Sequence, residues 1–301
     1  MRGQKPTPLN RIVPALVHIQ AHLDQDLSLE LLADRVQLSK FHFHQVFRQA
    51  TGETPRSYVE RLRLECAAVQ LRIRRVSVLD LALECGYRNH ETFSRAFRAR
   101  FTMSPRDYRK GWSRGERVGR RARFERAPDV VPGTELSPTR IVRLARMTVG
   151  FIRHLGPYEQ VSPDHFTRLL AWSRRRGDGT PLLLGIARDA PGITPANKIR
   201  FDCCVQAPAT FEADGDISCQ RTPAGEYAVT DYVGSWDMGP AYGSILDRLG
   251  NNPDLEIIGL PALEIYRTTR VGQRDAMARA SIAIPVKSRG GARPTGTRTP
   301  R

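Results

Sequence analysis

The sequence has few cysteines and no long apolar segment, and both absences exclude structural classes. Its 301 residues include five cysteines, none in a CxxC or Cys/His arrangement with ligand spacing. Neither a zinc site nor a disulfide framework is therefore expected, and we predict reduced, mostly buried thiols and no metal or other cofactor. No run of eighteen apolar residues exists, and the N-terminal stretch lacks the apolar region of a signal peptide. We expect no membrane segment and a cytoplasmic location.

Basic charge is concentrated toward the N-terminus. Residues 1–126 carry 25 Lys or Arg and 13 Asp or Glu, residues 127–286 carry 17 and 18, and residues 287–301 carry 5 and 0. A basic segment beside a neutral one is typical of a polyanion-binding module joined to a module that does not touch the polyanion. From charge alone, a merely soluble basic surface stays an open alternative.

Changes in composition predict the domain boundaries. The stretch from Gly111 to Ser137 is rich in Arg, Gly and Pro and lacks sustained apolar periodicity. The final stretch has no apolar side chain larger than alanine or proline and predicts a disordered basic tail. The predicted organisation is a first domain at 1–112, a linker at 113–137, a second domain at 138–287 and the tail at 288–301.

The first domain contains an internal sequence repeat. "SKFHFHQVFRQATGETPRSY" at 39–58 and "NHETFSRAFRARFTMSPRDY" at 89–108 share six identities at an offset of fifty residues. Each copy begins with an N-cap residue, Ser39 or Asn89, followed by apolar residues at helical spacing. A short capped helix precedes each copy, with Ser28 as one cap, and the turns are "QL" and "GYR", in which Gly86 can supply a positive backbone dihedral. Each unit therefore has the pattern of a helix-turn-helix.

A long connecting helix is predicted between the two units. "PRSYVERLRLECAAVQLRI" places apolar residues at spacings of three and four from Tyr58 to Ile73, with arginines on the rest of the helix. A rigid connector suits duplex DNA, where successive major grooves on one face lie about 34 Å apart. We therefore predict a multidomain chain that begins with an all-α double helix-turn-helix domain and binds double-stranded DNA.

Residues 9–112, including "GYRNHETFSRAFRARFTMSPRDYR", resemble the DNA-binding domain of AraC/XylS transcriptional regulators. The resemblance implies that the outward face of each second helix reads bases, through Phe41, His44 and Gln45 in the first unit and His90, Glu91 and Arg95 in the second.

The chemistry of these side chains suggests individual roles. Arg95 suits guanine, Gln45 suits adenine, and Glu91 can accept a hydrogen bond from a cytosine amine. Phosphate contacts, which position the protein without specifying sequence, are expected from Lys40, Arg48 and Arg98. For the last two, an ion pair with a nearby carboxylate is the alternative.

The second domain alternates strand-like and helix-like stretches, which predicts an α+β domain of two β-α-β-β units. In this alignment Tyr158 and Trp236 occupy matching positions. The domain resembles GyrI-like effector-binding domains through "LGPYEQV", "GIARDAPGITPANKIRFDCCV", "TPAGEYAVTDYVGSW" and "LPALEIY". The resemblance implies a small-molecule pocket faced by Glu264. In the loop "RDAP" of this sequence, Asp189 is the only acidic residue before the proline, where many members of the family have two. This difference puts in question whether the loop covers the pocket as a lid.

The strand pattern leaves the surroundings of Glu264 open. Glu264 and Tyr266 share one strand face, which either faces water or lines a cavity. The pattern alone favours water, and the resemblance favours a pocket. A carboxylate between aromatic walls formed by Tyr158, Trp236 and Tyr266 suits a lipophilic cation.

The leading interpretation is a bacterial transcription regulator, not an enzyme, that reads two adjacent major grooves under the control of a small organic ligand. Changed DNA affinity, domain orientation and contact with RNA polymerase are open routes for that control. One alternative is a small-molecule hydrolase with Glu264 as base and Tyr266 as proton donor, with His154 and His165 as candidates by residue type only. Another alternative is a nucleoid-type protein that binds DNA without sequence preference.

Overall fold

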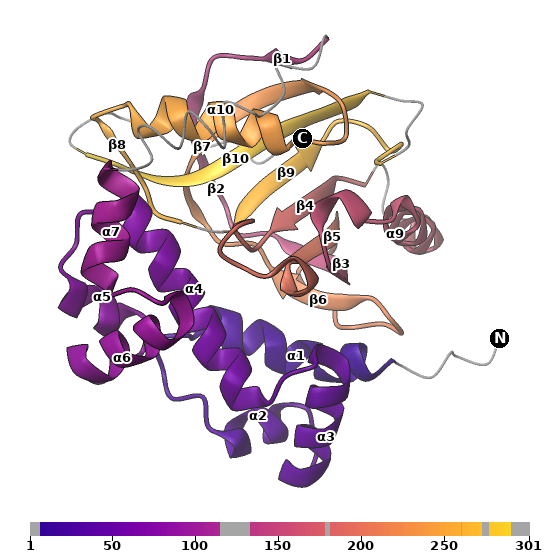
Figure 1. Ribbon diagram of the computed structural model, residues 1–301. Helices are drawn as coiled ribbons and strands as arrows, with labels where there is room; N and C mark the ends of the chain where they lie inside the picture. Colours follow the sequence, from indigo (N-terminus) through magenta and orange to yellow (C-terminus); the bar gives the residue numbers. More distant parts are fainter. Residues whose placement is uncertain (1–6, 115–132, 178–180, 260, 273–276, 290–301) are drawn as a thin grey trace. The chain divides into compact units, whose positions relative to one another are not determined.

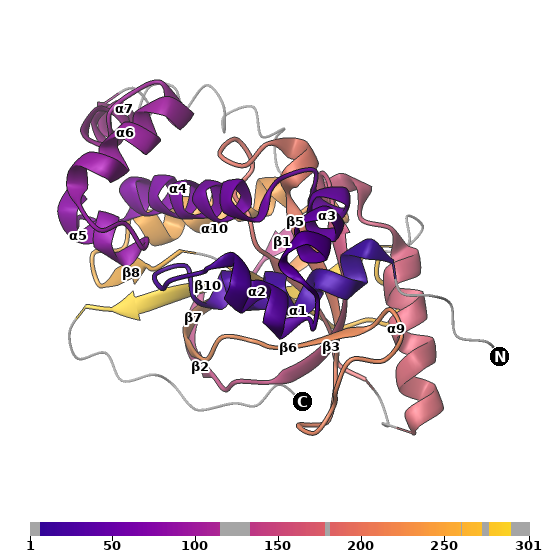
Figure 2. The same cartoon turned by 90° about the horizontal axis from the view of Figure 1, so that it is seen from below.

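The computed structural model describes residues 7–114, 133–177, 181–259, 261–272 and 277–289 (Figures 1 and 2). A helical part is followed by a part built on one sheet, and each is described by itself. No helix in these ranges is long and apolar enough to span a bilayer. The helices of the first part are α1 (Pro8–Ala21), α2 (Leu29–Arg35), α3 (Lys40–Thr51), α4 (Pro55–Ile73), α5 (Val78–Glu84), α6 (His90–Phe101) and α7 (Pro105–Arg114).

Polar N-caps explain where these helices begin. At α1 to α6, the cap side chain accepts a hydrogen bond from the backbone N–H three residues later, which satisfies one of the free N–H groups of the first turn. Ser104 does the same before α7, where it accepts from Asp107 N–H at 3.1 Å. The predicted caps Ser28, Ser39 and Asn89 are confirmed, and so is the predicted connecting helix α4.

The repeat is preserved in backbone geometry. Gly52 caps the C-terminus of α3 and Thr102, fifty residues later, caps that of α6, and both residues are left-handed with φ of 71° and 60°. The turn between α2 and α3 spans 36–39 and is longer than the predicted "QL". Val36 is the C-cap of α2 and Ser39 is the N-cap of α3, so neither residue lies within a helix. In the second turn Gly86 has φ of 78°, as predicted.

Each helix-turn-helix has aromatic residues in its core. In the first unit, Phe47 packs edge-on against Tyr58 with ring centroids 5.3 Å apart. Phe97 and Tyr108 repeat this contact at 5.3 Å in the second unit. α4 contributes Tyr58, Val59 and Leu62 to the first core. The two units are therefore separately packed bodies that share one helix.

The second part is a ten-stranded sheet with the order β1-β7-β10-β9-β4-β5-β3-β6, in which β2 also pairs with β7 and β8 with β10. Its elements are β1 (Glu135–Leu136), β2 (Arg140–Leu144), β3 (Thr148–Leu155), α9 (Pro163–Arg176), β4 (Leu183–Ala187), β5 (Arg200–Gln206), β6 (Ser218–Arg221), β7 (Gly225–Gly234), α10 (Gly239–Gly250), β8 (Leu255–Ile257), β9 (Ala262–Tyr266) and β10 (Ala278–Ser288).

Two β-α-β-β units lie within this sheet, as predicted. The first is β3-α9-β4-β5, and the second is β7-α10-β9-β10 with the short β8 inserted. The antiparallel pairing of β4 with β9 joins them and places Gly185 directly opposite Glu264. β8 was not predicted, because three residues are too few to show a period of two.

Regular structure enters both ends of the predicted linker. α7 extends to Arg114, and β1 forms at Glu135–Leu136 by pairing with Val233 and Tyr232 of β7. Residues 115–132, and the tail from 290 onward, lie outside the described residues. All five cysteines are free thiols, with Cys85, Cys203 and Cys204 buried and Cys66 and Cys219 partly exposed.

The turn at Gly86 generates a prediction about stability. A Cβ at this position would lie 2.3 Å from the Leu23 carbonyl oxygen and 2.8 Å from the Arg63 guanidinium, in addition to the strain of positive φ. We expect Gly86→Ala to lower the free energy of unfolding by more than about 1 kcal/mol, measured by thermal and urea unfolding. Gly177→Ala is the matched control, because its φ of 76° imposes similar strain while no described atom lies within 4 Å. Equal losses in both variants would show that the crowding is unimportant.

Candidate DNA interface and ligand site

The outward face of α3 carries the side chains predicted to read the first half-site. Phe43, Val46 and Phe47 are buried in the core, so the positions between them face away from it. Phe41 is 74% exposed, an unusual state for a large apolar side chain. The other exposed residues that were predicted on this helix are Lys40, Gln45 and Arg48. The predicted residue His44 is half-buried.

α6 repeats this arrangement with different chemistry. Phe93 and Phe97 are buried, while the predicted residues His90, Glu91, Arg95 and Arg98 are all exposed. Ser94 occupies the position equivalent to His44, and its Oγ lies 3.3 Å from His90 Nε2. Sequence reasoning missed Ser94, although the offset of fifty residues assigns it to the same face.

Existing contacts restrict some of these cations. Lys40 forms an ion pair with Glu30 of α2, and because both side chains are more than half exposed, the pair is weak and screened by salt. Arg48 and Arg98 form no ion pair with any carboxylate of the described residues, so the predicted alternative is not realised for them. Arg11 of α1 donates to His42 Nε2 at 3.1 Å. Because arginine can only donate, this contact places the proton of neutral His42 on Nδ1.

Glu264 is buried in the second part of the chain, with 8% of its surface exposed. Tyr242 of α10 donates a hydrogen bond to its Oε1 at 3.0 Å, and Tyr266 of the same strand donates to Oε2 at 2.5 Å. Burial raises the pKa of Glu264 above its usual value, and the two hydroxyl donors oppose that rise. The carboxyl group therefore does not face water, contrary to what the strand pattern alone favours.

Aromatic rings from several elements lie around Tyr266, whose hydroxyl donates to this carboxyl group. The Tyr266 ring lies 5.3 Å from Phe166 of α9 and 6.0 Å from Trp236, measured between centroids. Contacts to both helices show that α9 and α10 cover the sheet face that bears Glu264. Trp236, Tyr266 and Glu264 are thus neighbours in the structure, and their role in binding a ligand stays a prediction.

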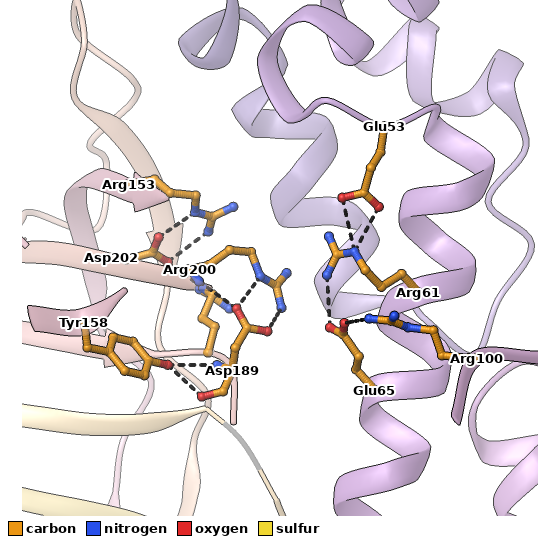
Figure 3. Close-up of polar contacts among 10 residues, drawn as sticks. Glu53, Arg61, Glu65, Arg100, Arg153, Tyr158, Asp189, Arg200 and Asp202 are labelled. Atoms are coloured by element: carbon orange, nitrogen blue, oxygen red, sulfur yellow. Dashed lines mark hydrogen bonds and ion pairs between the residues drawn. The ribbon is translucent and has the colours of Figure 1, made fainter. Parts of the chain in front are cut away.

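Tyr158, the fourth predicted ligand residue, holds the adjacent loop. Its hydroxyl donates to the Asp189 carbonyl at 2.7 Å and accepts from the Asp189 N–H at 3.1 Å (Figure 3). The Asp189 carboxylate binds the Arg200 guanidinium at 2.6 and 2.8 Å, and both side chains are buried. A single acidic residue before the proline is therefore sufficient to fix this loop.

Gly185 provides the space that the buried tyrosine occupies. A Cβ there would lie 2.9 Å from the Tyr266 hydroxyl and 2.2 Å from the Phe201 ring. Because Gly185 lies opposite Glu264 across the β4–β9 junction, one unit supplies the carboxyl group and the other leaves room for its hydroxyl donor.

Sequence reasoning missed Tyr242, although the internal repeat contains a signal for it. Aligning Pro163 with Pro240 at the starts of α9 and α10 places His165 where the second unit has Tyr242. His165 lies beside His154, with ring centroids 6.1 Å apart, and burial lowers the pKa of both. His154 Nε2 lies 3.2 Å from the Pro157 carbonyl oxygen. No group of three or more His, Cys, Asp or Glu side chains suited to a metal ion occurs in the part of the chain that is described.

Comparisons with known proteins divide the chain in the same way. A helix-turn-helix domain family matches residues 32–111, and the GyrI-like small molecule binding domain family matches residues 137–287. The transcriptional regulator Rob of Salmonella typhimurium is 28% identical over 286 residues, which cover 90% of this chain and 96% of Rob.

Two further relatives each match about a third of this chain. The regulatory protein SoxS of Salmonella typhimurium is 37% identical over 100 residues, covering 33% of this chain and 94% of SoxS. A solved transcriptional regulator with an AraC-type DNA-binding domain, from Chromobacterium violaceum, is 27% identical with a TM-score of 0.33, covering 35% of this chain and 93% of that one. The chain joins a DNA-binding helix-turn-helix region to a GyrI-like small molecule binding domain. These matches and the alignment with Rob show that the chain belongs to the AraC family of transcriptional regulators, and that it is a regulator and not an enzyme.

Proposed function

We propose that this regulator recognises a specific DNA sequence by placing α3 and α6 in two adjacent major grooves. The observation that carries the proposal is the pair of outward helix faces, which expose side chains able to read base edges while the apolar faces are buried. The 19-residue connector α4 is about 28 Å long, which is comparable with the groove spacing of about 34 Å.

The proposed effector is a lipophilic organic cation. Glu264 is buried among aromatic rings, and among the described residues no lysine or arginine pairs with its carboxyl group. A cation between the rings and the carboxylate gains charge pairing and cation–π attraction in a place where water is scarce. For such a ligand to control transcription in the cytoplasm, it must bind two states of the protein with different affinities. Changed DNA affinity is the simplest route, and domain orientation and contact with RNA polymerase are the others.

Selection from a random duplex library at physiological salt, followed by footprinting, tests the DNA proposal. The expected result is one enriched site with two contacted major-groove segments a helical turn apart. A nucleoid-type protein would instead enrich no sequence and would weaken alike on all duplexes as salt rises. That result, obtained with and without the candidate ligand, would refute specific reading.

Arg95→Ala tests the assignment of base and phosphate contacts. We expect a loss of about 1–3 kcal/mol in binding free energy at one base position, with relaxed preference there, because a bidentate contact to guanine is removed. Binding to a set of single-base variants of the selected site provides the measurement. Arg98→Ala on the same helix is the matched control and should weaken all variants equally. If Arg95→Ala also weakens them equally, Arg95 is a phosphate contact.

Glu264→Gln tests the proposed ligand chemistry. Calorimetric titration with benzyltrimethylammonium should show at least a tenfold loss of affinity, about 1.4 kcal/mol, because the buried charge pair is removed. The uncharged isostere neopentylbenzene should bind both proteins alike. In the unchanged protein, affinity for the cation should fall as pH falls through the pKa of Glu264, which burial raises above its usual value, because the proton and the cation compete for the carboxylate. Equal affinity for both ligands in both proteins would refute a cation site.

Tyr242→Phe tests the charge of Glu264 in the absence of ligand. Removing a donor from a buried carboxylate should lower stability by about 1–3 kcal/mol at neutral pH. Because the pKa of Glu264 is raised in the folded protein, this loss should disappear as pH falls through that pKa and the carboxyl group becomes neutral. Tyr227→Phe is the matched control, since its buried hydroxyl donates to the neutral Pro223 carbonyl at 3.1 Å. A loss with the same pH dependence in both variants would contradict the role given to Tyr242.

A further inference from the structure

A chain of ion pairs crosses the helical part from the end of α3 to α6 (Figure 3). Arg61 of α4 donates through Nε to both oxygens of Glu53, at 2.9 and 3.2 Å, and through Nη1 to Glu65 at 3.0 Å. The other oxygen of Glu65 accepts from Arg100 of α6 at 3.2 Å. Two positive and two negative groups thus alternate along one path.

This ion-pair chain is mostly buried. The side chains of Arg61, Glu65 and Glu53 are 9%, 5% and 14% exposed, whereas Arg100 is 34% exposed. Buried ion pairs contribute little net stability because desolvation offsets their attraction. They nevertheless favour one geometry strongly, because a displaced charge would stay buried without its partner. The ion-pair chain is therefore better suited to fixing the relative positions of the helices that it connects than to stabilising the fold.

The ends of this chain belong to different reading units. Glu53 follows Gly52, the C-cap residue of the first recognition helix α3. Arg61 also lies over the Tyr58 ring at 4.9 Å, and Tyr58 packs against Phe47 of α3. Arg100 belongs to the last turn of the second recognition helix α6. The two apolar cores are separate, so these contacts are a direct polar connection between the units.

Among the described residues, the ion-pair chain occurs only once, between the two helix-turn-helix units, and is not part of the repeated unit. The second copy of the repeat has Met103 where the first has Glu53, and Gly111 where the first has Arg61. A network required for folding a helix-turn-helix would be expected in both copies. We propose that Glu53, Arg61, Glu65 and Arg100 are positioning residues that fix α6 relative to α3, and thereby set the spacing between the two half-sites that the protein accepts on DNA. This inference rests on the proposed reading of two grooves.

The experiment measures affinity for duplexes that contain both selected half-sites with the spacer shortened, unchanged or lengthened by one base pair. One base pair rotates a half-site by about 34°, so a rigidly connected pair of helices should discriminate strongly among the three duplexes. Arg100→Met breaks the most exposed link, and we expect the preference for the selected spacing to fall about tenfold. Arg100→Lys retains the charge near Glu65 and should restore most of the preference.

Arg74→Met is the matched control. It removes one positive charge and one arginine–glutamate pair, to Glu84 of α5, but that pair does not connect the two recognition helices. It should keep the original spacing preference, and both Met variants should bind a single half-site equally.

The other outcomes are distinct. If Arg100→Met weakens all three duplexes equally and leaves the preference intact, Arg100 is a phosphate contact and the positioning role is wrong. If the unchanged protein itself shows no spacing preference on its selected site, the reading of two grooves fails, and the inference fails with it.

Discussion

The sheet domain depends on the pairing of β4 with β9. This antiparallel ladder joins two β-α-β-β units and places Gly185 opposite Glu264, at the centre of the sheet. Without the ladder, the carboxyl group of one unit would not lie beside the space left by the other. The first unit also contributes Phe166 of α9, whose ring packs against the Tyr266 ring of the second unit.

Burial without a cationic partner gives Glu264 its chemical character. Two tyrosine hydroxyls hold the carboxyl group, and they supply hydrogen bonds but no compensating charge. A carboxylate in this state is destabilised by desolvation, and a bound cation removes part of that cost. Asp202 in the same sheet is the contrasting case, because Arg153 and Arg188 surround it and hold its pKa well below the usual range despite complete burial. Two buried carboxyl groups in one sheet therefore differ in their partners: Asp202 is paired with arginines, whereas Glu264 accepts hydrogen bonds from tyrosine hydroxyls.

The helical domain was predictable from sequence because its signals are local. Ser39 and Asn89 cap helices whose apolar spacing is visible within twelve residues, and the repeat confirms the register. The surroundings of Glu264 were less predictable, since alternation in β9 assigns Tyr266 to the same face but does not say whether that face is covered. Tyr242 reaches Glu264 only after α10 docks on the sheet. Arg61 and Glu65 were invisible for a similar reason, because they lie on the arginine-rich side of a helix whose apolar stripe alone was read as buried.

The connection of both helix-turn-helix units through one helix has a consequence for the proposed DNA site. The two recognition helices display unlike side chains, with Phe41 and Gln45 on α3 at the positions of Glu91 and Arg95 on α6. A dimer of identical units reads the same sequence twice around a two-fold axis, and its binding site reads alike in both directions. If α3 and α6 both read bases as proposed, two unlike helices in one chain require a site without that symmetry. Such a site has polarity, so inverting it within a promoter would turn the bound regulator to face the opposite direction along the duplex.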